Sequence, residues 1–448
     1  MKKESRRKLI VLIIFTIFIA NGFNFVIGKP NSINYKTLTE FNFNDESNRL
    51  ITSTNDVIFQ KLILGFMKLA NFPAISAAVV KEDEFLWADG FGRCDIENQK
   101  DSTENSIYLV ASISKTFTAT AIMQLCEKGL FELDDDVNDY LPFNLRNPNH
   151  PEEPITFRML LAHQSSIATD LPNFITIAMP GGLEILGYPH PFLEDYLLPS
   201  GIYYRPQVWN DYPPGENMYY ANMGYALLGY LVEILSNTSF EEYCRQNIFD
   251  PLNMHNTSFK LSNLNTTNLA VPYDYQLGNF YPYIHYNILD YPAGGLRTTV
   301  ADLSYYLIAF INGGKNGDTR ILEENSVEEM HKIHYPSDTY NFQYGLGFQI
   351  WEKPNDTIIG HTGGLFGVAT KMIFRKSDKT GIIFFANRDL INYREIFAFS
   401  MIEQLLFWKA AGFSSDFFTE YNFNNAINSN KHLLKNKNIQ DNFLISSI

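Results

Sequence analysis

Ser112 and Lys115 are the residues whose types and spacing most clearly suggest chemistry. They lie in the run Ala111 to Ala119, and apolar residues recur after it in a helical pattern. A spacing of three places both side chains on one helix face, one turn apart. A partly buried lysine can lose its proton and act as a base toward a hydroxyl group. The pair therefore predicts a serine nucleophile with a lysine base, and the alternative is an N-cap serine followed by a surface lysine.

A second candidate element is the triplet Tyr220-Ala221-Asn222, which precedes an apolar helical pattern starting at Gly224. A cationic lysine beside a tyrosine lowers the pKa of the phenol. We therefore expect Tyr220 to act as a phenolate that carries a proton between nucleophile and leaving group. Asn222 can both donate to and accept from a substrate amide. The alternative is a core tyrosine followed by a turn asparagine.

The third element has two candidates. Lys379-Thr380-Gly381 lies in the turn of an expected hairpin, where glycine is common for backbone reasons. His361-Thr362-Gly363-Gly364 follows the apolar pair Ile358-Ile359, as expected of a strand edge that lets a substrate backbone approach closely. We favour the run that starts at His361, because a strand edge suits substrate binding better than a hairpin turn does.

Taken together and in this order, the three elements resemble the serine β-lactamase and penicillin-binding superfamily. The resemblance is to its class C-like branch, which includes D-alanyl-D-alanine carboxypeptidases and esterases, and it extends from about Ile58 to Phe407. Four segments between and around the motifs also resemble the family: Leu133 to Val137, Ile155 to His163, Tyr291 to Leu296 and Tyr344 to Phe348.

The resemblance implies acyl transfer through a covalent intermediate on Ser112. Lys115 and Tyr220 would handle the proton, and Asn222 would hold the substrate. The backbone N–H groups of Ser112 and Gly364 would form the oxyanion hole, with His361, Thr362 and Gly363 beside it. Water would then release the acyl group from a small-molecule or peptide substrate. No cofactor is implied.

Two positions depart from the family pattern. His361 stands where the lactamases have a lysine, so a fixed positive charge for a substrate carboxylate becomes a titratable one. The run from His163 to Ser166 stands where relatives commonly have a Ser-Gly pair. We therefore expect hydrolysis of an ester, an amide, or a β-lactam-like or D-amino-acid peptide bond, and the pattern favours esterase or D-peptidase activity over true β-lactamase activity. The alternative function is a secreted or membrane-tethered binding protein that keeps the fold without catalysis.

The elements that would position these residues predict an α+β fold. A helix is expected from Asp56 to Ala70, capped by Asn55, followed by a hairpin with strands at 74–80 and 85–88. A second hairpin is expected at 370–374 and 381–386, with a closing helix from Tyr393 to Ala410. Both chain ends would build one antiparallel sheet, and the middle would form a mostly helical lobe.

The chain divides into four parts by composition. Residues 1–28 combine a basic start with an apolar run, which indicates a cleaved signal peptide or an uncleaved signal anchor formed by residues 9–28. Residues 29–55 are a polar linker, 56–410 the hydrolase-like domain, and 411–448 a polar tail. Within the domain, 169–214 is rich in Pro, Gly and Tyr and is expected to be lid-like. Either N-terminal interpretation places the domain outside the cytoplasm.

Charge and cysteine content narrow the remaining function classes. The 448-residue chain has a formal net charge of -14, so it lacks the basic surface of a nucleic-acid-binding protein. Its three cysteines are too few for a disulfide framework. His331 and His334 are three residues apart but have no metal-binding motif around them, so we expect surface or capping histidines and no metal site. The sequence sets no oligomeric state.

Overall fold

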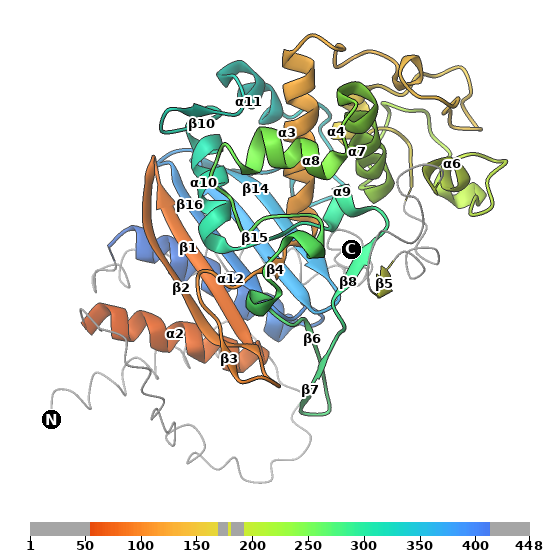
Figure 1. The fold of residues 1–448 in the computed structure, drawn as a ribbon. Coiled ribbons are helices and arrows are strands. Elements are labelled where there is room, and N and C mark those ends of the chain that lie inside the picture. The colour runs from red at the N-terminus through yellow and green to blue at the C-terminus, as the bar shows by residue number, and fades with distance from the viewer. Residues whose placement is uncertain (1–53, 169–177, 181–191, 413–448) are drawn as a thin grey trace, which may run out of the picture. The chain divides into compact units, whose positions relative to one another are not determined.

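The computed structural model describes residues 54–168, 178–180 and 192–412 (Figure 1). The expected signal or anchor (1–28) lies outside the described residues, as do residues 29–53 of the linker, 413–448 of the tail, and 169–177 and 181–191 of the lid-like insert. The α-helices are α2 Thr54–Ala70, α3 Ser114–Glu127, α4 Phe157–Leu161, α6 Phe192–Leu197, α7 Asn222–Ser236, α8 Phe240–Cys244, α9 Tyr291–Gly294, α10 Val300–Ile311, α11 Glu324–Met330 and α12 Tyr393–Ala410.

The strands divide into those of a large antiparallel sheet and those of short two-stranded ladders. The large sheet contains β1 Ala74–Lys81, β2 Glu84–Asp95, β3 Lys100–Asp101, β12 Gln343–Tyr344, β13 Gln349–Lys353, β14 Asp356–Leu365, β15 Val368–Arg375 and β16 Thr380–Ala386. The ladders pair β4 Tyr108–Leu109 with β9 Arg297–Thr298, β5 Ala178–Pro180 with β8 Tyr286–Ile288, β6 Tyr273–Gln276 with β7 Asn279–Pro282, and β10 Lys315–Asn316 with β11 Thr319–Arg320.

The large sheet joins the two ends of the domain, as the sequence predicts. Its strand order is β12-β13-β14-β15-β16-β1-β2-β3, so the last strand of the chain pairs with the first. Ile75 lies opposite Ala386 and Lys81 opposite Thr380 in this central pairing. The mixed architecture with one large antiparallel sheet confirms the α+β prediction.

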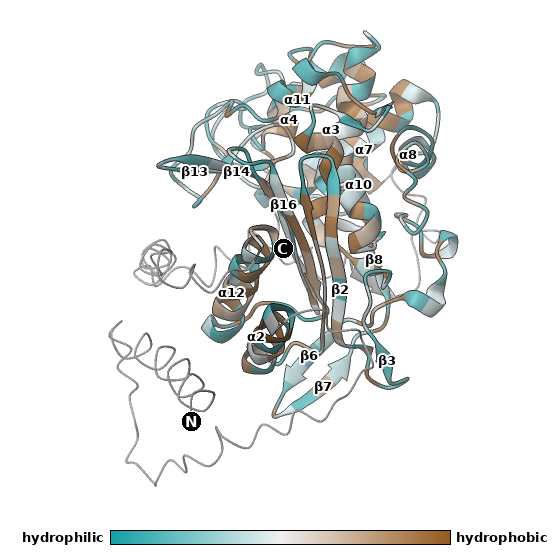
Figure 2. Ribbon diagram, turned by 90° about the vertical axis from the view of Figure 1, so that its left-hand side faces the viewer, coloured by the Kyte–Doolittle hydropathy of each residue, from teal (hydrophilic) through white to brown (hydrophobic). Residues whose placement is uncertain are grey.

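Both faces of the central strand β1 are buried, which explains its continuous apolar sequence. Ala74, Ala78 and Val80 belong to the core on the side of the helical lobe, whereas Ile75, Ala77 and Val79 belong to the core under α2 and α12. Successive side chains of a strand point to opposite faces, so seven consecutive buried residues need cover on both sides. Figure 2 shows α2 and α12 together on one face, with α10 and the helical lobe on the other.

The expected hairpins and closing helix are confirmed, but β2 continues to Asp95, well beyond the predicted end at residue 88. The helix α12 has the predicted bounds, and Asn392 and Glu395 form a capping box at its start. The first helix begins at Thr54, so Asn55 lies inside its first turn and the expectation that it precedes the helix is wrong. None of the helices in the described ranges is long and apolar enough to cross a bilayer.

The helical lobe is built around α3, which starts at the expected chemical site. Phe117 on α3 stacks on Tyr306 of α10, with ring centres 3.9 Å apart. The hydroxyl of Thr118 donates to the carbonyl of Pro292, which fastens α3 to α9 at 2.6 Å. In the described part of the insert, Trp209 donates its indole N–H to the carbonyl of Leu197 at the end of α6. The first two contacts fasten α3 to α10 and α9.

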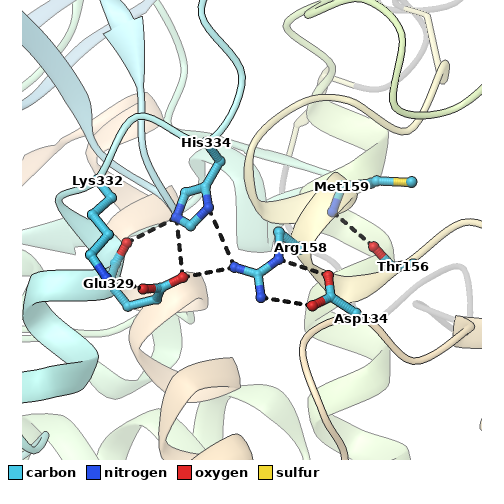
Figure 3. A network of polar contacts seen from close by, with 7 residues as sticks. All are labelled: Asp134, Thr156, Arg158, Met159, Glu329, Lys332 and His334. Carbon is cyan, nitrogen blue, oxygen red and sulfur yellow. Dashed lines mark hydrogen bonds and ion pairs between the residues drawn. The ribbon is translucent and has the colours of Figure 1, made fainter.

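A polar network fastens the α4 segment to α11 (Figure 3). Arg158 on α4 forms ion pairs with Asp134, at 2.7 Å, and with Glu329 on α11, at 2.8 Å. His334 accepts from Arg158 through Nδ1 and donates to the carbonyl of Glu329 through Nε2. His331 is the residue that caps the C-terminal end of α11, one of the two locations expected for it, and it is partly exposed. The network fixes the position of α4, whose C-terminal end leads into His163.

Candidate active site

Ser112 lies on a tight turn that two strands hold in place. The turn Ala111–Ile113 is a single turn of 3-10 helix that runs directly into α3, so Ser112 precedes the α-helix without capping it. Val110 donates its N–H to Leu296 and accepts at its carbonyl from the hydroxyl of Thr370 on β15. Ala111 has φ +49, a left-handed conformation that costs energy for any residue with a Cβ. The backbone is therefore forced into one conformation beside Ser112.

Lys115 is completely buried and points at Ser112. Its Nζ lies 3.1 Å from the Ser112 Oγ and donates to the carbonyl of Ala293 at 2.8 Å. Ser112 is 3% exposed and Lys115 0%. Burial lowers the pKa of the Lys115 ammonium, and the charge of Asp290 opposes this only in part. Desolvation therefore favours the neutral amine, which is the form that can accept a proton from Ser112.

Asp290 is a buried carboxyl at this centre that the motif analysis missed. It is 0% exposed, precedes α9 and has no hydrogen-bond partner for either side-chain oxygen within the described part of the chain. Burial raises its pKa, whereas the charge of Lys115 lowers it. The available sequence signal was a single acidic residue in the otherwise apolar surroundings of Ile288, Leu289 and Tyr291. Asp290 and Lys115 form a coupled pair that holds the centre near electrical neutrality.

Tyr220 lies beside the same pair, but the expectation of a phenolate is wrong. The Lys115 Nζ is 4.8 Å from the centre of the Tyr220 ring. Burial raises the pKa of the Tyr220 phenol, and the nearby Ser112 hydroxyl offsets only part of that rise. A lysine charge beside the phenol would lower its pKa, but desolvation is the larger effect because Tyr220 is only 1% exposed. Tyr220 is therefore a neutral phenol in contact with the nucleophile.

Asn222 begins α7 and is 7% exposed, so the whole triplet is carried at one helix start. His163 holds this start in place, because its Nδ1 accepts the backbone N–H of Ala221 at 3.1 Å. The His163 ring packs 4.3 Å from the ring of Tyr220 and 4.6 Å from that of Tyr344. Burial and the nearby Lys115 keep the pKa of His163 well below its ordinary value. In the sequence, His163 stood out only as a departure from the family turn. The signal for its structural role was its place at the end of the apolar run Met159 to Ala162.

His361 is buried on β14 and its two ring nitrogens both have partners. Because a carbonyl oxygen only accepts, Nδ1 carries the proton that it donates to Thr362, at 2.6 Å. Nε2 then accepts from the hydroxyl of Tyr344 at 2.8 Å. Burial and the charge of Lys115 lower the pKa of His361 to about 3. The expectation of a charge that titrates near neutral pH is therefore wrong, since this imidazole stays neutral.

Thr362, Gly363 and Gly364 follow His361 along the strand edge that faces the Ser112 turn. Thr362 donates its N–H to the side chain of Gln349, at 2.9 Å, which directs this N–H away from the neighbouring strand β15. Backbone N–H groups of residues two apart in a strand point the same way, so Gly364 presents its N–H on this free edge. A Cβ on Gly363 would lie 2.3 Å from the carbonyl oxygen of Val110. Glycine is required there because the Ser112 turn lies directly on the strand.

The competing Lys379-Thr380-Gly381 motif is placed elsewhere. Lys379 is in the β15–β16 turn with φ +52, and Gly381 pairs with Val80 and Phe374 inside the sheet. The structure brings the His361 run, and not this one, to the pair of Ser112 and Lys115. The candidate residues from three distant parts of the sequence thus lie around one buried centre. Within the described ranges, no group of three or more potential ligands could hold a metal ion.

Comparison with known proteins agrees with this arrangement. A family model described as Beta-lactamase matches residues 59–396. Protein flp of Staphylococcus aureus (strain N315) is 25% identical over 346 residues, and the match covers 75% of this chain but only 64% of that protein's length. The structure of the octameric penicillin-binding protein homologue from Pyrococcus abyssi is similar with a TM-score of 0.61 and 26% identity, covering 78% of this chain and 77% of that one.

The D-amino acid amidase from Ochrobactrum anthropi SV3, solved with L-phenylalanine amide, shares the fold with a TM-score of 0.65. Its identity is 21%, and the match covers 81% of this chain and all of that one. The family model spans the Ser112 turn, the Tyr220 triplet and the His361 strand. The chain therefore belongs to the beta-lactamase family.

Proposed function

We propose that this protein is a serine hydrolase that forms an acyl-enzyme on Ser112 and cleaves an ester or amide bond. The observation that carries the proposal is the 3.1 Å contact between the Ser112 Oγ and the Nζ of a fully buried Lys115. Its Nζ donates hydrogen bonds to the Ser112 Oγ and to the Ala293 carbonyl, so the amine is held against the nucleophile. The names of the solved neighbours, among them an amidase and a penicillin-binding protein homologue, support a hydrolase of this type.

In the first step, Ser112 attacks the substrate carbonyl carbon and its hydroxyl proton passes to the neutral amine of Lys115. The carbonyl oxygen becomes an oxyanion, which the N–H groups of Ser112 and Gly364 stabilise. Removing one such donor typically costs about 3–4 kcal/mol in the transition state. The neutral His361 and Thr362 lie beside this oxyanion site on the same strand.

In the second step, the tetrahedral intermediate collapses and the bond to the leaving group breaks. The phenol of Tyr220 donates its proton to the departing oxygen or nitrogen, and the Lys115 ammonium restores that proton. Because burial keeps Tyr220 protonated, it acts as an acid here. Water then attacks the ester on Ser112 as the neutral Lys115 accepts a proton from it. The bond between the acyl carbon and the Ser112 Oγ breaks, Lys115 returns the proton to that oxygen, and the acid product leaves.

Hydrolysis of short-chain nitrophenyl esters tests this proposal. Replacing Lys115 with Met should lower the rate by about 100- to 10,000-fold, the usual contribution of a general base. Lys128→Met is the matched control, because Lys128 ends the same helix and contacts Tyr243 instead. Equal rates for the two variants would refute the role of Lys115. Activity that persists in Ser112→Ala would refute the acyl-enzyme.

A further inference from the structure

The backbone that carries Tyr220 belongs to no helix or strand. Residues 218–221 are irregular, and α7 begins only at Asn222. A helix or strand satisfies its backbone N–H groups within a regular ladder, whereas an irregular buried segment needs partners from elsewhere in the chain. The position of the Tyr220 phenol therefore depends on the residues that bind this backbone.

Three consecutive N–H groups of this segment donate to two residues from distant parts of the sequence. The N–H of Tyr219 donates to the carbonyl of His163 at 2.9 Å, and the N–H of Ala221 donates to the Nδ1 of the same histidine at 3.1 Å. Between them, the N–H of Tyr220 donates to the hydroxyl of Tyr340 at 3.1 Å. The backbone of Tyr220 is thus held on both sides and at its own N–H group.

Tyr340 is held in turn by its own loop. Its ring stacks on that of Phe342, with ring centres 5.3 Å apart. Gln343 closes the loop, because its side-chain oxygen accepts the N–H of Ser337 at 2.9 Å and its NH₂ group donates to the Ser337 carbonyl at 2.8 Å. Burial raises the pKa of the Tyr340 phenol, so the hydroxyl stays uncharged. It has a fixed place beside the backbone of Tyr220.

His163 supplies its side-chain contact only in the neutral form. Its Nδ1 accepts the N–H of Ala221, so the ring proton is on Nε2. Burial and the charge of Lys115 keep the pKa of His163 well below its ordinary value. Its backbone has φ +58, a left-handed conformation that asparagine adopts more readily than most residues. The Oδ1 of an asparagine, as many bonds from the backbone as Nδ1, could take over the same contact.

We propose that Tyr340 and His163 are positioning residues for the Tyr220 phenol and set how well this hydrolase cleaves substrates with a basic leaving group. The more basic the leaving group, the more its departure depends on a proton from Tyr220. A displacement of the phenol by about 1 Å would slow this departure by about 100-fold, with Lys115 still in contact with Ser112. The inference rests on the proposed function, because it assumes that Tyr220 is the acid for an acyl-enzyme on Ser112.

Two acetate esters and one covalent label test the inference. Phenyl acetate has a more basic leaving group than nitrophenyl acetate, and a fluorophosphonate loses fluoride, which needs no proton. For Tyr340→Phe, kcat/KM should fall about 10- to 100-fold with phenyl acetate and at least about threefold less with nitrophenyl acetate, and labelling of Ser112 should stay within about twofold. A general loosening of the fold would slow all three reactions alike. Equal losses on the two esters, or no loss on either, would overturn the inference.

The matched control is Tyr335→Phe, which should leave all three rates unchanged. Tyr335 lies in the same loop, and its hydroxyl makes no hydrogen bond within the part of the chain that the structure describes. His163→Asn should keep the ratio of the two ester rates close to that of the parent, whereas His163→Ala should lose activity selectively on phenyl acetate. The opposite order of these two variants would contradict the role of the Nδ1 contact.

A double variant shows whether Tyr340 acts through Tyr220. Once Tyr220→Phe has removed the acid, adding Tyr340→Phe should cause no further loss on phenyl acetate. Losses that multiply in the double variant would mean that the two residues act independently, and they would refute the positioning role. A parent protein that cleaves neither ester and acquires no label on Ser112 would instead refute the proposed function itself.

Discussion

The close approach of Gly363 to the Ser112 turn leads to a sharp prediction for Gly363→Ala. The added Cβ would lie 2.3 Å from the Val110 carbonyl oxygen, 2.3 Å from the Thr370 hydroxyl and 3.2 Å from the Ala111 Cβ. Two of these neighbours hold the turn, through the hydrogen bond from Thr370 to Val110. Ordinary contact would require the turn and the strand to separate by about 1 Å.

That displacement affects stability and chemistry by different amounts. Overpacking of a close-packed core typically costs about 1–3 kcal/mol of the free energy of unfolding. A misplacement of about 1 Å between a nucleophile and its electrostatic partners costs about 100-fold in rate. Gly363→Ala should therefore stay folded at room temperature but lose about 100-fold in the rate at which Ser112 reacts.

The assay is the second-order rate constant for labelling by a fluorophosphonate, with urea unfolding measured in parallel. Gly224→Ala is the matched control, because a Cβ there meets its nearest neighbour, a Leu160 methyl group, at an ordinary 3.6 Å. It should keep both the labelling rate and the stability of the parent. If Gly363→Ala labels as fast as the parent while it is destabilised as expected, Gly363 does not set the position of Ser112 and the reasoning is refuted.

Three further predictions follow from the same centre. Asp290→Asn removes the charge that raises the pKa of Lys115, so Lys115 should lose its proton at lower pH. The fall in the labelling rate on the acid side should then move to lower pH, and a move to higher pH would contradict the effect of Asp290 on Lys115. Tyr220→Phe should lower nitrophenyl ester turnover by about 100- to 10,000-fold, the range for a lost general acid, whereas the remote Tyr306→Phe should not; equal turnover would exclude Tyr220 as the acid. Arg158→Met should lower the free energy of unfolding in urea by about 1–2 kcal/mol, because the half-buried Arg158 side chain pairs with both Asp134 and Glu329; no loss would show that the network is not stabilising.

The parts of the fold that could be predicted are those with a simple periodicity. The helix from Tyr393 to Ala410 and both hairpins were predicted because apolar spacing and turn residues mark them directly. The pairing of the two chain ends followed from the same patterns, since unpaired apolar strands at both ends need partners. The start of α2 was placed two residues too late, at Asp56 instead of Thr54, because Asn55 has the side chain of a good N-cap residue.

The chemistry at the centre was predicted less completely, because burial is set by distant segments. The spacing of Ser112 and Lys115 correctly predicted that their side chains meet, but it could not show how completely the site is shielded from solvent. Desolvation keeps Tyr220 a neutral phenol where a phenolate was expected, and it keeps His361 neutral where a titratable positive charge was expected. Asp290 and Gln349 were missed because each is a single polar residue inside an apolar run, and their partners come from other strands and helices.

The most direct test of the central claim is to trap the covalent intermediate and locate it. The parent protein is treated with a labelled fluorophosphonate, digested, and its peptides are sequenced by mass spectrometry. The adduct should be on Ser112, should be absent from Ser112→Ala, and should form more slowly in Lys115→Met than in Lys128→Met. A folded parent protein that acquires no adduct, or that is labelled at a different residue, would contradict the assignment of Ser112 as a nucleophile activated by Lys115.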